Sequence, residues 1–264
     1  MLPFVSVFGL EIPVYGILSI VGIAVCAVVI IVLSKKKQFD LYDVLITAVV
    51  AGLGVFLGAH ILYAVTRIED IIFAFTLYDD FGNKWDFIKH LLDVSSGLVF
   101  YGGLYGGLLA GYLWIRHKKY PLGIFSDVFA VVIPLFHTFG RVGCFFAGCC
   151  YGVEWEYGLM GRVLSSDKHE YVTRFPVQLA EAFLLILLFV VLLLLYLKNK
   201  CKGRLMTVYL SAYAVIRFIL EFLRGDEIRG HLWIFSTSQW ISLLTLSGVI
   251  LYLVIDSKKR RQTK

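Results

Sequence analysis

Long apolar runs are the feature that most constrains this chain. Seven of them approach the length of about 20 residues that an α-helix needs to cross the hydrocarbon of a bilayer. Charged residues make up 17% of the chain, against about a quarter in a soluble domain, so too few exist to cover a wet surface. A purely soluble protein is therefore excluded. The predicted spans cover about residues 15–33, 46–65, 98–115, 128–147, 177–197, 205–223 and 240–255.

Basic residues predict how the spans are oriented. The connections after the first, third, fifth and seventh runs hold 15 of the 25 Lys and Arg residues, and basic loops stay in the cytoplasm. The predicted fold class is an all-α integral membrane protein with seven transmembrane helices, its N-terminus outside and its C-terminus cytoplasmic. Residues 1–264 would form a single polytopic membrane domain, with extracytoplasmic loops at about 66–97 and 151–176. The first run lacks a basic leader and a small-residue cleavage site, so we interpret it as a retained span.

The net charge of +6 has two explanations. A basic chain is often a partner of nucleic acid, but here the basic residues cluster at the ends of the apolar runs. We therefore expect membrane lipid, and no nucleic acid, among the partners. Within the first long outer loop, residues 71–77 and 85–92 suit short amphipathic pieces at the interface, and simple connecting loops explain them equally well.

Ionisable residues inside or at the ends of the predicted spans are the main candidates for chemistry, because a charge in hydrocarbon is costly and usually serves a function. An ion network that only fastens helices together explains the two glutamates equally well. It explains the arginines less well, because they outnumber the carboxylates and have the forked shape that binds phosphate. The candidates are His60, His137, Arg141, Glu181, Arg217, Glu221 and Arg224.

Glycine is concentrated in two segments. The first, residues 102–111, contains overlapping Gly-x-x-x-Gly spacings, as does Gly54 with Gly58, and their default meaning is close helix packing in lipid. The second, residues 140–152, combines glycine, cysteine and arginine at the end of a span. That combination predicts irregular backbone beside a polar cavity.

Three of the five cysteines, Cys144, Cys149 and Cys150, lie in the second segment. Such close spacing does not resemble a disulfide framework, in which cysteines fasten distant loops. Zinc sites usually leave about two to four residues between paired ligands, so the spacing supports zinc only weakly, and no metal ligand is predicted. Buried, unreactive thiols explain the cluster better, and a redox or thiol-relay role stays open.

Short motifs follow one another along nearly the whole chain. They are Tyr15-Gly16; Gly58-Ala59-His60-x-x-Tyr63; Phe100-Tyr101-Gly102-Gly103-Leu104; Ser126-Asp127, Pro134 and Gly140-Arg141 to Gly152; Pro176-x-Gln178-Leu179-x-Glu181; and Tyr213-x-x-x-Arg217-Phe218-x-x-Glu221-Phe222-x-Arg224 with Ser238-Gln239-x-x-Ser242. In order and spacing, this set resembles the phosphatidylglycerol–prolipoprotein diacylglyceryl transferases of bacterial membranes.

The resemblance implies a transferase of the bacterial cytoplasmic membrane, and no motif of the chain implies a cofactor. Its reaction would move the diacylglyceryl group of phosphatidylglycerol to the lipobox cysteine thiol of a prolipoprotein signal peptide, forming a thioether and releasing glycerol phosphate. The catalytic residues implied are Tyr101, Arg141 and Arg217, the arginines supporting the phosphate leaving group. The substrate-binding residues implied are Tyr15, Gly102, Gly103, Arg141, Cys144, Gly152, Glu181, Arg217, Glu221 and Arg224.

The chain departs from the family pattern at several positions. Tyr101 stands where the family has a histidine often assigned as the base, Cys144 replaces an asparagine, Cys149 a glutamate, and His60 an arginine. A tyrosine with an unperturbed pKa of about 10 is a poor base at neutral pH. Two alternatives therefore stay open: a divergent transferase with another acceptor, and a non-catalytic, lipid-binding or transport-type membrane protein.

Overall fold

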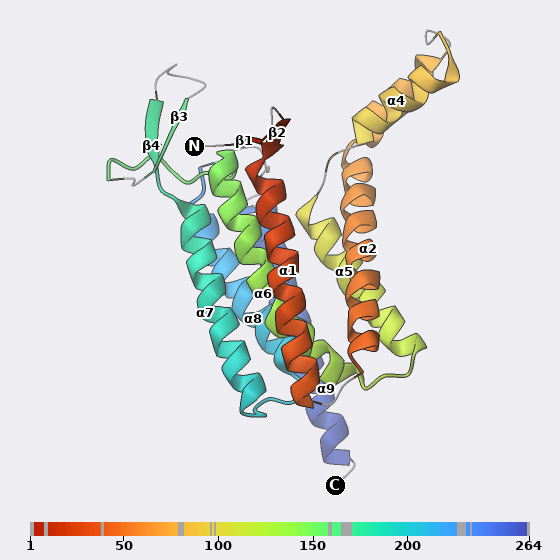
Figure 1. The fold of residues 1–264 in the computed structure, drawn as a ribbon, viewed down its shortest axis with the longest axis vertical. Coiled ribbons are helices and arrows are strands. Elements are labelled where there is room, and N and C mark those ends of the chain that lie inside the picture. The colour runs from red at the N-terminus through yellow and green to blue at the C-terminus, as the bar shows by residue number, and fades with distance from the viewer. Residues whose placement is uncertain are drawn as a thin grey trace. The chain divides into compact units, whose positions relative to one another are not determined.

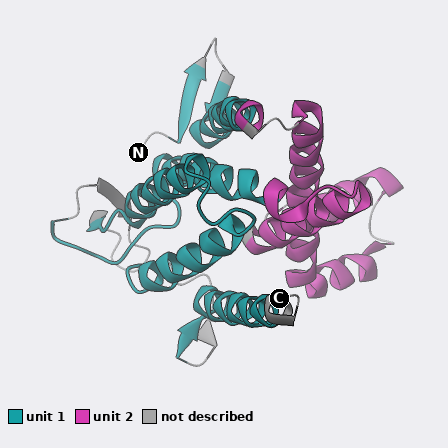
Figure 2. Ribbon diagram, turned by 90° about the horizontal axis from the view of Figure 1, so that it is seen from below, with its two compact units in different colours: residues 1–33, 126–264 teal, residues 34–125 magenta. Residues whose placement is uncertain are grey.

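The computed structural model describes residues 3–7, 10–37, 40–78, 82–95, 97, 99–157, 160–164, 171–225, 231–232 and 234–262 (Figure 1). The chain divides into two compact units, which we call unit 1 (residues 1–33 and 126–264) and unit 2 (residues 34–125), shown in Figure 2. The single polytopic membrane domain stays a prediction, and each of the two units has packing of its own.

Unit 1 contains helices from both ends of the sequence. A hairpin of β1 (Phe4–Val7) and β2 (Leu10–Pro13) leads directly into α1 (Val14–Lys37), whose last turn belongs to unit 2. The other helices are α6 (Leu122–Ala147), which begins in unit 2, α7 (Val177–Leu197), α8 (Leu205–Glu221) and α9 (Thr237–Gln262). Two more antiparallel hairpins are β3 (Met160–Leu164) with β4 (Tyr171–Arg174), and β5 (His231–Leu232) with β6 (Phe235–Ser236).

Helix α7 illustrates why these helices suit a membrane. Leu185 and Leu192 are fully buried, whereas Phe183, on the same helix, leaves 62% of its surface exposed. Large exposed apolar side chains are unfavourable in water but not in lipid, and a helix satisfies its own backbone polar groups there. The exposed apolar surface of α7 therefore fits a bilayer.

Five of the described helices are long and apolar enough to cross a membrane, namely α1, α2 (Leu41–Thr66), α6, α7 and α9. They coincide with five of the seven predicted spans, which confirms a multi-pass membrane protein. The other two predicted runs also form helices, α5 (Phe100–His117) and α8, of 18 and 17 residues. Helix α8 ends at Glu221, a little before the predicted boundary. The residues that follow leave the helix and form backbone hydrogen bonds with residues 151–153.

Unit 2 is built on the pairing of α2 with α5, and glycine makes that pairing close. A Cβ atom added to Gly58 would lie 2.3 Å from the carbonyl oxygen of Gly102, and one added to Gly106 would lie 2.3 Å from that of Gly54. Real Cβ atoms do not approach so near, so the two backbones are in direct contact. The prediction of close helix packing is confirmed at these four positions.

The two predicted outer loops contain regular structure. The first holds α3 (Ile68–Thr76) and α4 (Lys84–Ser95), where the amphipathic pieces were predicted. The two helices meet through aromatic rings: Phe87 lies edge-on against Phe75 and Tyr78, with ring centroids 5.3 and 4.9 Å apart. The second holds the β3–β4 hairpin, which the sequence analysis did not predict.

A buried aspartate fixes the start of α8. Asp127 is 2% exposed, and its Oδ1 atom accepts a hydrogen bond of 2.8 Å from the backbone N–H of Leu205, the first residue of α8. Its Oδ2 atom accepts from the N–H of Gly203. The first N–H groups of a helix have no partner within it, so Asp127 on α6 acts as a cap supplied from a distant part of the sequence.

Candidate functional site

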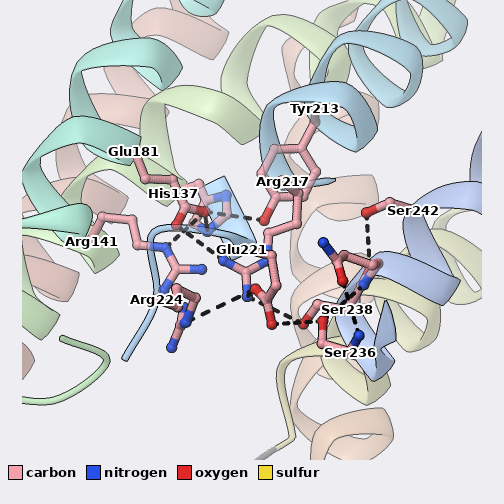
Figure 3. Close-up of polar contacts among 11 residues, drawn as sticks. His137, Arg141, Glu181, Tyr213, Arg217, Glu221, Arg224, Ser236, Ser238 and Ser242 are labelled. Carbon is pink, nitrogen blue, oxygen red and sulfur yellow. Dashed lines mark hydrogen bonds and ion pairs between the residues drawn. The ribbon is translucent and has the colours of Figure 1, made fainter. Parts of the chain in front are cut away.

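Three helices of unit 1 and the segment after α8 bring ionisable side chains to one place (Figure 3). On α6, His137 and Arg141 lie one turn apart and therefore share a face. Helix α7 contributes Glu181 from its first turns, just after Pro176 has ended the preceding loop. Helix α8 and the residues that follow it contribute Arg217, Glu221 and Arg224.

Glu181 is the centre of this cluster. It is 1% exposed; its Oε1 atom lies 3.0 Å from Nε of Arg141, and its Oε2 atom lies 3.5 Å from Nη1 of Arg217. The hydroxyl of Tyr213 donates to Oε1 over 3.3 Å, and Nε2 of His137 lies 3.9 Å from the same oxygen. A carboxylate removed from water needs partners of this kind, because an unpaired buried charge costs several kcal/mol.

Glu221 is the second carboxylate of the cluster. Its Oε2 atom lies 2.5 Å from Nη2 of Arg217, one turn earlier on α8, and 4.0 Å from Nε of Arg224. The hydroxyl of Ser236 donates to its Oε1 atom over 2.9 Å. Arg217 therefore bridges both glutamates, and its own side chain is 3% exposed.

A layer of hydroxyl and amide groups at the start of α9 supports the arginine. Nη2 of Arg217 donates to Oγ of Ser238 over 3.2 Å. The side-chain oxygen of Gln239 accepts from the backbone N–H of Ser236 over 3.0 Å, and Ser242 donates to the carbonyl of Ser238. None of these four residues was among the predicted site residues. The signal that could have found them is the run of polar residues that opens an otherwise apolar span.

The cluster carries an excess of positive charge. Among the residues that the structure describes, three arginines face two carboxylates, which leaves one positive charge over if His137 is neutral. Arg141 touches Glu181 through Nε alone, as an ion pair whose direction is not that of a hydrogen bond. Its two Nη groups make no hydrogen bond to the described residues. Two such groups in one plane form the fork that binds two oxygens of a phosphate.

The three cysteines of the segment after Arg141 lie together. Helix α6 ends with the N–H of Gly148 bonded to the carbonyl of Phe145 and that of Cys149 bonded to the carbonyl of Cys144. This is the Schellman pattern, for which Gly148 supplies a φ of 73°. It folds the chain back, so that the three Sγ atoms of Cys144, Cys149 and Cys150 lie within 4.8 Å of one another.

This turn interacts with both helix α7 and the charged cluster. The side-chain amide of Gln178, on α7, donates to the carbonyl of Cys149 over 2.7 Å. Hydrogen bonds from the Cys144 and Cys149 thiols, with the nearby Arg224 guanidinium, hold the pKa of the Cys150 thiol below its usual range. The cysteine segment and the arginines are thus neighbours within unit 1.

Tyr15 and Gly152, two predicted substrate-binding residues, also lie in this region of unit 1. The ring of Tyr15 packs against Gly143 of α6, where an added Cβ atom would lie 2.8 Å from it. Gly152 lies between two backbones: an added Cβ would lie 2.4 Å from the carbonyl oxygen of Phe175 and 2.8 Å from that of Leu223. Gly152 also pairs with Arg224 in an isolated β-bridge. No larger residue fits there, so Gly152 positions the segment that carries Arg224.

The remaining predicted residues belong to unit 2. Tyr101, Gly102 and Gly103 lie in the first turn of α5, and Gly102 and Gly103 pack against α2. Nδ1 of His60 lies 2.9 Å from the carbonyl oxygen of Phe56, so this residue bonds within its own helix. Packing accounts for the two glycines, and the roles predicted for Tyr101, Gly102 and Gly103 at a substrate stay predictions.

Chemically, the arrangement in unit 1 is suited to an anion. A network that only held helices together would be expected to contain equal numbers of acidic and basic side chains, with every donor group hydrogen-bonded. Here a cation is in excess, and the fork of Arg141 has donors to spare. Buried ion networks contribute little to stability, and charges inside a membrane usually serve a function. A functional role therefore explains this network better than a structural one.

Comparison with known proteins yields a consistent result. The family model described as "Prolipoprotein diacylglyceryl transferase" matches residues 3–255. The chain is 32% identical to a phosphatidylglycerol–prolipoprotein diacylglyceryl transferase of Clostridium tetani, over 97% of this chain and 98% of that protein. It is also 32% identical to transferase 2 of the same description from Clostridium perfringens (98% and 96% covered), and 28% identical to one from Campylobacter jejuni (96% and 93%).

Proposed function

The chain belongs to the prolipoprotein diacylglyceryl transferase family, and on that premise we propose that it transfers the diacylglyceryl group of phosphatidylglycerol to a prolipoprotein, with its buried arginines holding the lipid phosphate. The acceptor is the thiol of the lipobox cysteine. The products are a thioether-linked lipoprotein precursor and glycerol phosphate.

This reaction makes two demands. The acceptor thiol must lose its proton, because the thiolate is the nucleophile that attacks the glyceryl carbon. As the new C–S bond forms, the C–O bond to phosphate breaks and its electron pair leaves on the phosphate oxygen. The phosphate charge therefore grows from one negative toward two. Fixed cations around that oxygen lower the barrier, because they stabilise the transition state more than the bound lipid.

Arg141 is the observation that carries the proposal. Its Nε atom pairs with Glu181, while its two Nη groups make no hydrogen bond to the described residues and suit two oxygens of a phosphodiester. The excess of one positive charge in the cluster complements the single negative charge of that group. A phospholipid phosphate would therefore be attracted to the cluster.

The other members of the cluster serve Arg141 and the phosphate. Glu181 and Glu221 hold Arg217 from two sides, so its guanidinium is kept in one position and does not have to be reorganised during the reaction. Arg224, paired with Glu221 and placed by the bridge to Gly152, adds a third cation. The carboxylates therefore orient the site rather than react.

Seven transmembrane helices, with the N-terminus outside and the C-terminus cytoplasmic, complete the proposal. Five helices have the required length and hydropathy, and α5 and α8 would cross as the shorter members. The basic connections that follow α1, α5, α7 and α9 support this orientation. The charged cluster then faces the outer leaflet of the bacterial cytoplasmic membrane, which is the side where a prolipoprotein arrives.

A transfer assay in proteoliposomes tests the proposal. Purified protein is reconstituted with phosphatidylglycerol and a lipobox peptide, and the mass of the peptide is followed. We expect a diacylglyceryl increment on the cysteine and release of glycerol phosphate. Vesicles of phosphatidylcholine alone, and a peptide with serine in place of the cysteine, should give neither. No increment in phosphatidylglycerol vesicles with a folded protein would favour a divergent transferase with another acceptor.

A further inference from the structure

The cysteine cluster has the composition and geometry of a metal site. Sγ atoms of Cys144, Cys149 and Cys150 lie within 4.8 Å of one another, and none of the five cysteines of the chain forms a disulfide. In a zinc–thiolate site the Zn–S distance is about 2.3 Å, so the sulfurs of a tetrahedral site lie roughly 3.8 Å apart. Small side-chain rotations would bring these three atoms to that separation.

The backbone, rather than the spacing, makes the cluster possible. Cys144 and Cys149 are separated by four residues, at the limit of ordinary zinc-ligand spacings, yet the Schellman turn at Gly148 returns the chain to the end of α6. Cys150 has a positive φ of 59°, an uncommon conformation for a residue with a side chain. Gln178 fixes the turn from α7 through the carbonyl of Cys149. Backbone contacts thus bring the three thiols together, and the Cys149 thiol adds a contact of 3.7 Å to the carbonyl of Cys144.

Three thiol ligands favour a soft cation and leave its fourth coordination position open. Cysteine sulfur prefers Zn²⁺ over the hard cations Mg²⁺ and Ca²⁺. Three protein ligands with an open fourth position are the arrangement of zinc sites that act on a substrate, whereas purely structural sites have four. The cluster is also accessible, because Cys149 is exposed and Cys144 and Cys150 are partly exposed.

The surrounding charges suit a zinc–thiolate centre. Three thiolates and Zn²⁺ together carry one negative charge, and Arg141 and Arg224 act electrostatically on the cluster from nearby. The same arginines belong to the proposed phosphate site. A nucleophile bound at the cluster would therefore be close to the charges that support the leaving group.

We propose that Cys144, Cys149 and Cys150 bind a Zn²⁺ ion whose fourth position takes the acceptor thiol of the transfer reaction. The inference rests on the proposed function. Binding to Zn²⁺ releases the thiol proton to water and leaves a zinc-bound thiolate. This thiolate attacks the glyceryl carbon, a C–S bond forms, the C–O bond breaks, and the electron pair leaves with glycerol phosphate. The thioether then departs from Zn²⁺, because an uncharged sulfur is a weaker ligand.

The carboxylates of the cluster do not offer an obvious alternative for this proton. Glu181 contacts two arginines and Glu221 contacts two as well. A carboxylate held between guanidinium groups is a weak proton acceptor, because protonation would discard both ion pairs. A metal that activates the thiol directly removes the need for such a base.

Cobalt binding tests the metal site without reference to activity. Co²⁺ is added to the full-length protein in detergent under anaerobic conditions, and the thiolate-to-cobalt charge-transfer band in the near ultraviolet is measured. We expect one Co²⁺ per chain, displaced by Zn²⁺, in the wild type and in Cys201→Ser, whose cysteine lies in a distant exposed turn. Cys149→Ser and Cys144→Ser should lose most of the band. Its absence from the folded wild type, or its survival unchanged in Cys149→Ser, would overturn the site.

The open position is tested with the acceptor. Addition of a lipobox peptide should shift the visible cobalt spectrum, and the same peptide with serine in place of cysteine should not. Labelling by a maleimide gives a second measurement, since Zn²⁺ should slow modification of Cys149 at least 10-fold and leave Cys201, in the same molecule, unchanged. A disulfide within the cluster of freshly purified, active protein would contradict the proposal.

Activity assays separate this inference from the proposed function. Removal of zinc by a chelator should lower diacylglyceryl transfer at least 10-fold, and Zn²⁺ should restore it. Full transfer by metal-free protein would refute the role of zinc and leave the transferase proposal intact. A protein that binds Co²⁺ and the peptide thiol, but transfers nothing from phosphatidylglycerol, would refute the proposed function and leave the metal site intact.

Discussion

The two units hold their helices together by opposite means. In unit 2, α2 and α5 touch through glycine, with backbone against backbone. In unit 1, α6, α7 and α8 meet through a buried network of arginines and glutamates. Glycine contacts in lipid allow close packing without burying a charge. Buried ions lose hydration free energy, and their pairing offsets only part of that loss. Because close glycine packing can hold helices together, a buried ion network is not required for stability in unit 1.

The interior of unit 1 is therefore expected to serve the reaction, and the interior of unit 2 to serve stability. We expect substitutions in the charged network to affect transfer more than stability, and substitutions among the glycines to do the reverse.

Loss of the Arg141 guanidinium should have the largest effect. Arg141→Ala removes the fork proposed for the phosphate and cancels the excess positive charge of the cluster. Removal of one such donor typically lowers kcat by about 100- to 1,000-fold. Thermal unfolding should change much less, because Glu181 keeps Arg217 and Tyr213 as partners. The measurement is the initial rate of peptide modification in proteoliposomes, beside an unfolding curve in detergent.

Arg141→Lys serves as the matched control for charge. It keeps the cation but loses the planar pair of donors, so we expect activity between those of Arg141→Ala and the wild type. Wild-type activity in Arg141→Ala would show that the network is structural. The contrast between the two units would then fail.

A bulky side chain at Gly58 should have the next largest effect. Gly58→Leu places atoms where the carbonyl of Gly102 lies, so α2 and α5 must separate. Overpacking of this kind costs about 1–3 kcal/mol. Unfolding temperature in detergent should fall, and the residual folded protein should still transfer lipid. Gly52→Ala is the control on the same helix, because an added Cβ there meets nothing within 4 Å. An unchanged unfolding temperature in Gly58→Leu would contradict the packing.

Sequence reasoning could identify the residues of both interiors but not how they meet. Charges inside apolar runs are so unfavourable in lipid that Arg141, Glu181 and Arg217 stand out without a structure. Gly-x-x-x-Gly likewise predicts close packing from spacing alone. Which glutamate contacts which arginine depends on how three helices lie side by side, and no local pattern in one helix encodes that.

Contacts between distant or short segments were beyond prediction for a related reason. Cys144 and Cys149 meet because the turn after α6 closes on itself, and Gly148 at the end of the helix is the sequence signal for such a turn. Asp127 caps α8 from 78 residues away, and only tertiary structure determines such a partner. The short outer strands lie in loops whose mixed composition gave no periodicity of either kind.

The cap formed by Asp127 predicts an intermediate effect on stability. Asp127→Ala leaves the N–H groups of Gly203 and Leu205 without an acceptor at the start of α8. Loss of a cap costs about 0.5–2 kcal/mol of unfolding free energy, measurable by denaturant titration. Asp127→Asn keeps one side-chain oxygen as an acceptor and should lose less than the alanine variant. Equal loss in both would point to the charge, rather than the hydrogen bonds, as the stabilising feature.

The exposed pair of Arg67 and Asp70, at the start of α3, should have the smallest effect. Its atoms are 2.9 Å apart, a separation within the range of the buried pairs, yet its side chains are 54% and 52% exposed. Solvent screens such a pair, and a double-mutant cycle of Arg67→Ala and Asp70→Ala should give a coupling within the error of the measurement. The buried pair of Arg217 and Glu221 should give a larger coupling in the same cycle, because removal of one partner strands the other charge. A coupling at Arg67 as large as that of the buried pair would mean that this surface is shielded from water, and distance rather than burial would then decide what an ion pair contributes here.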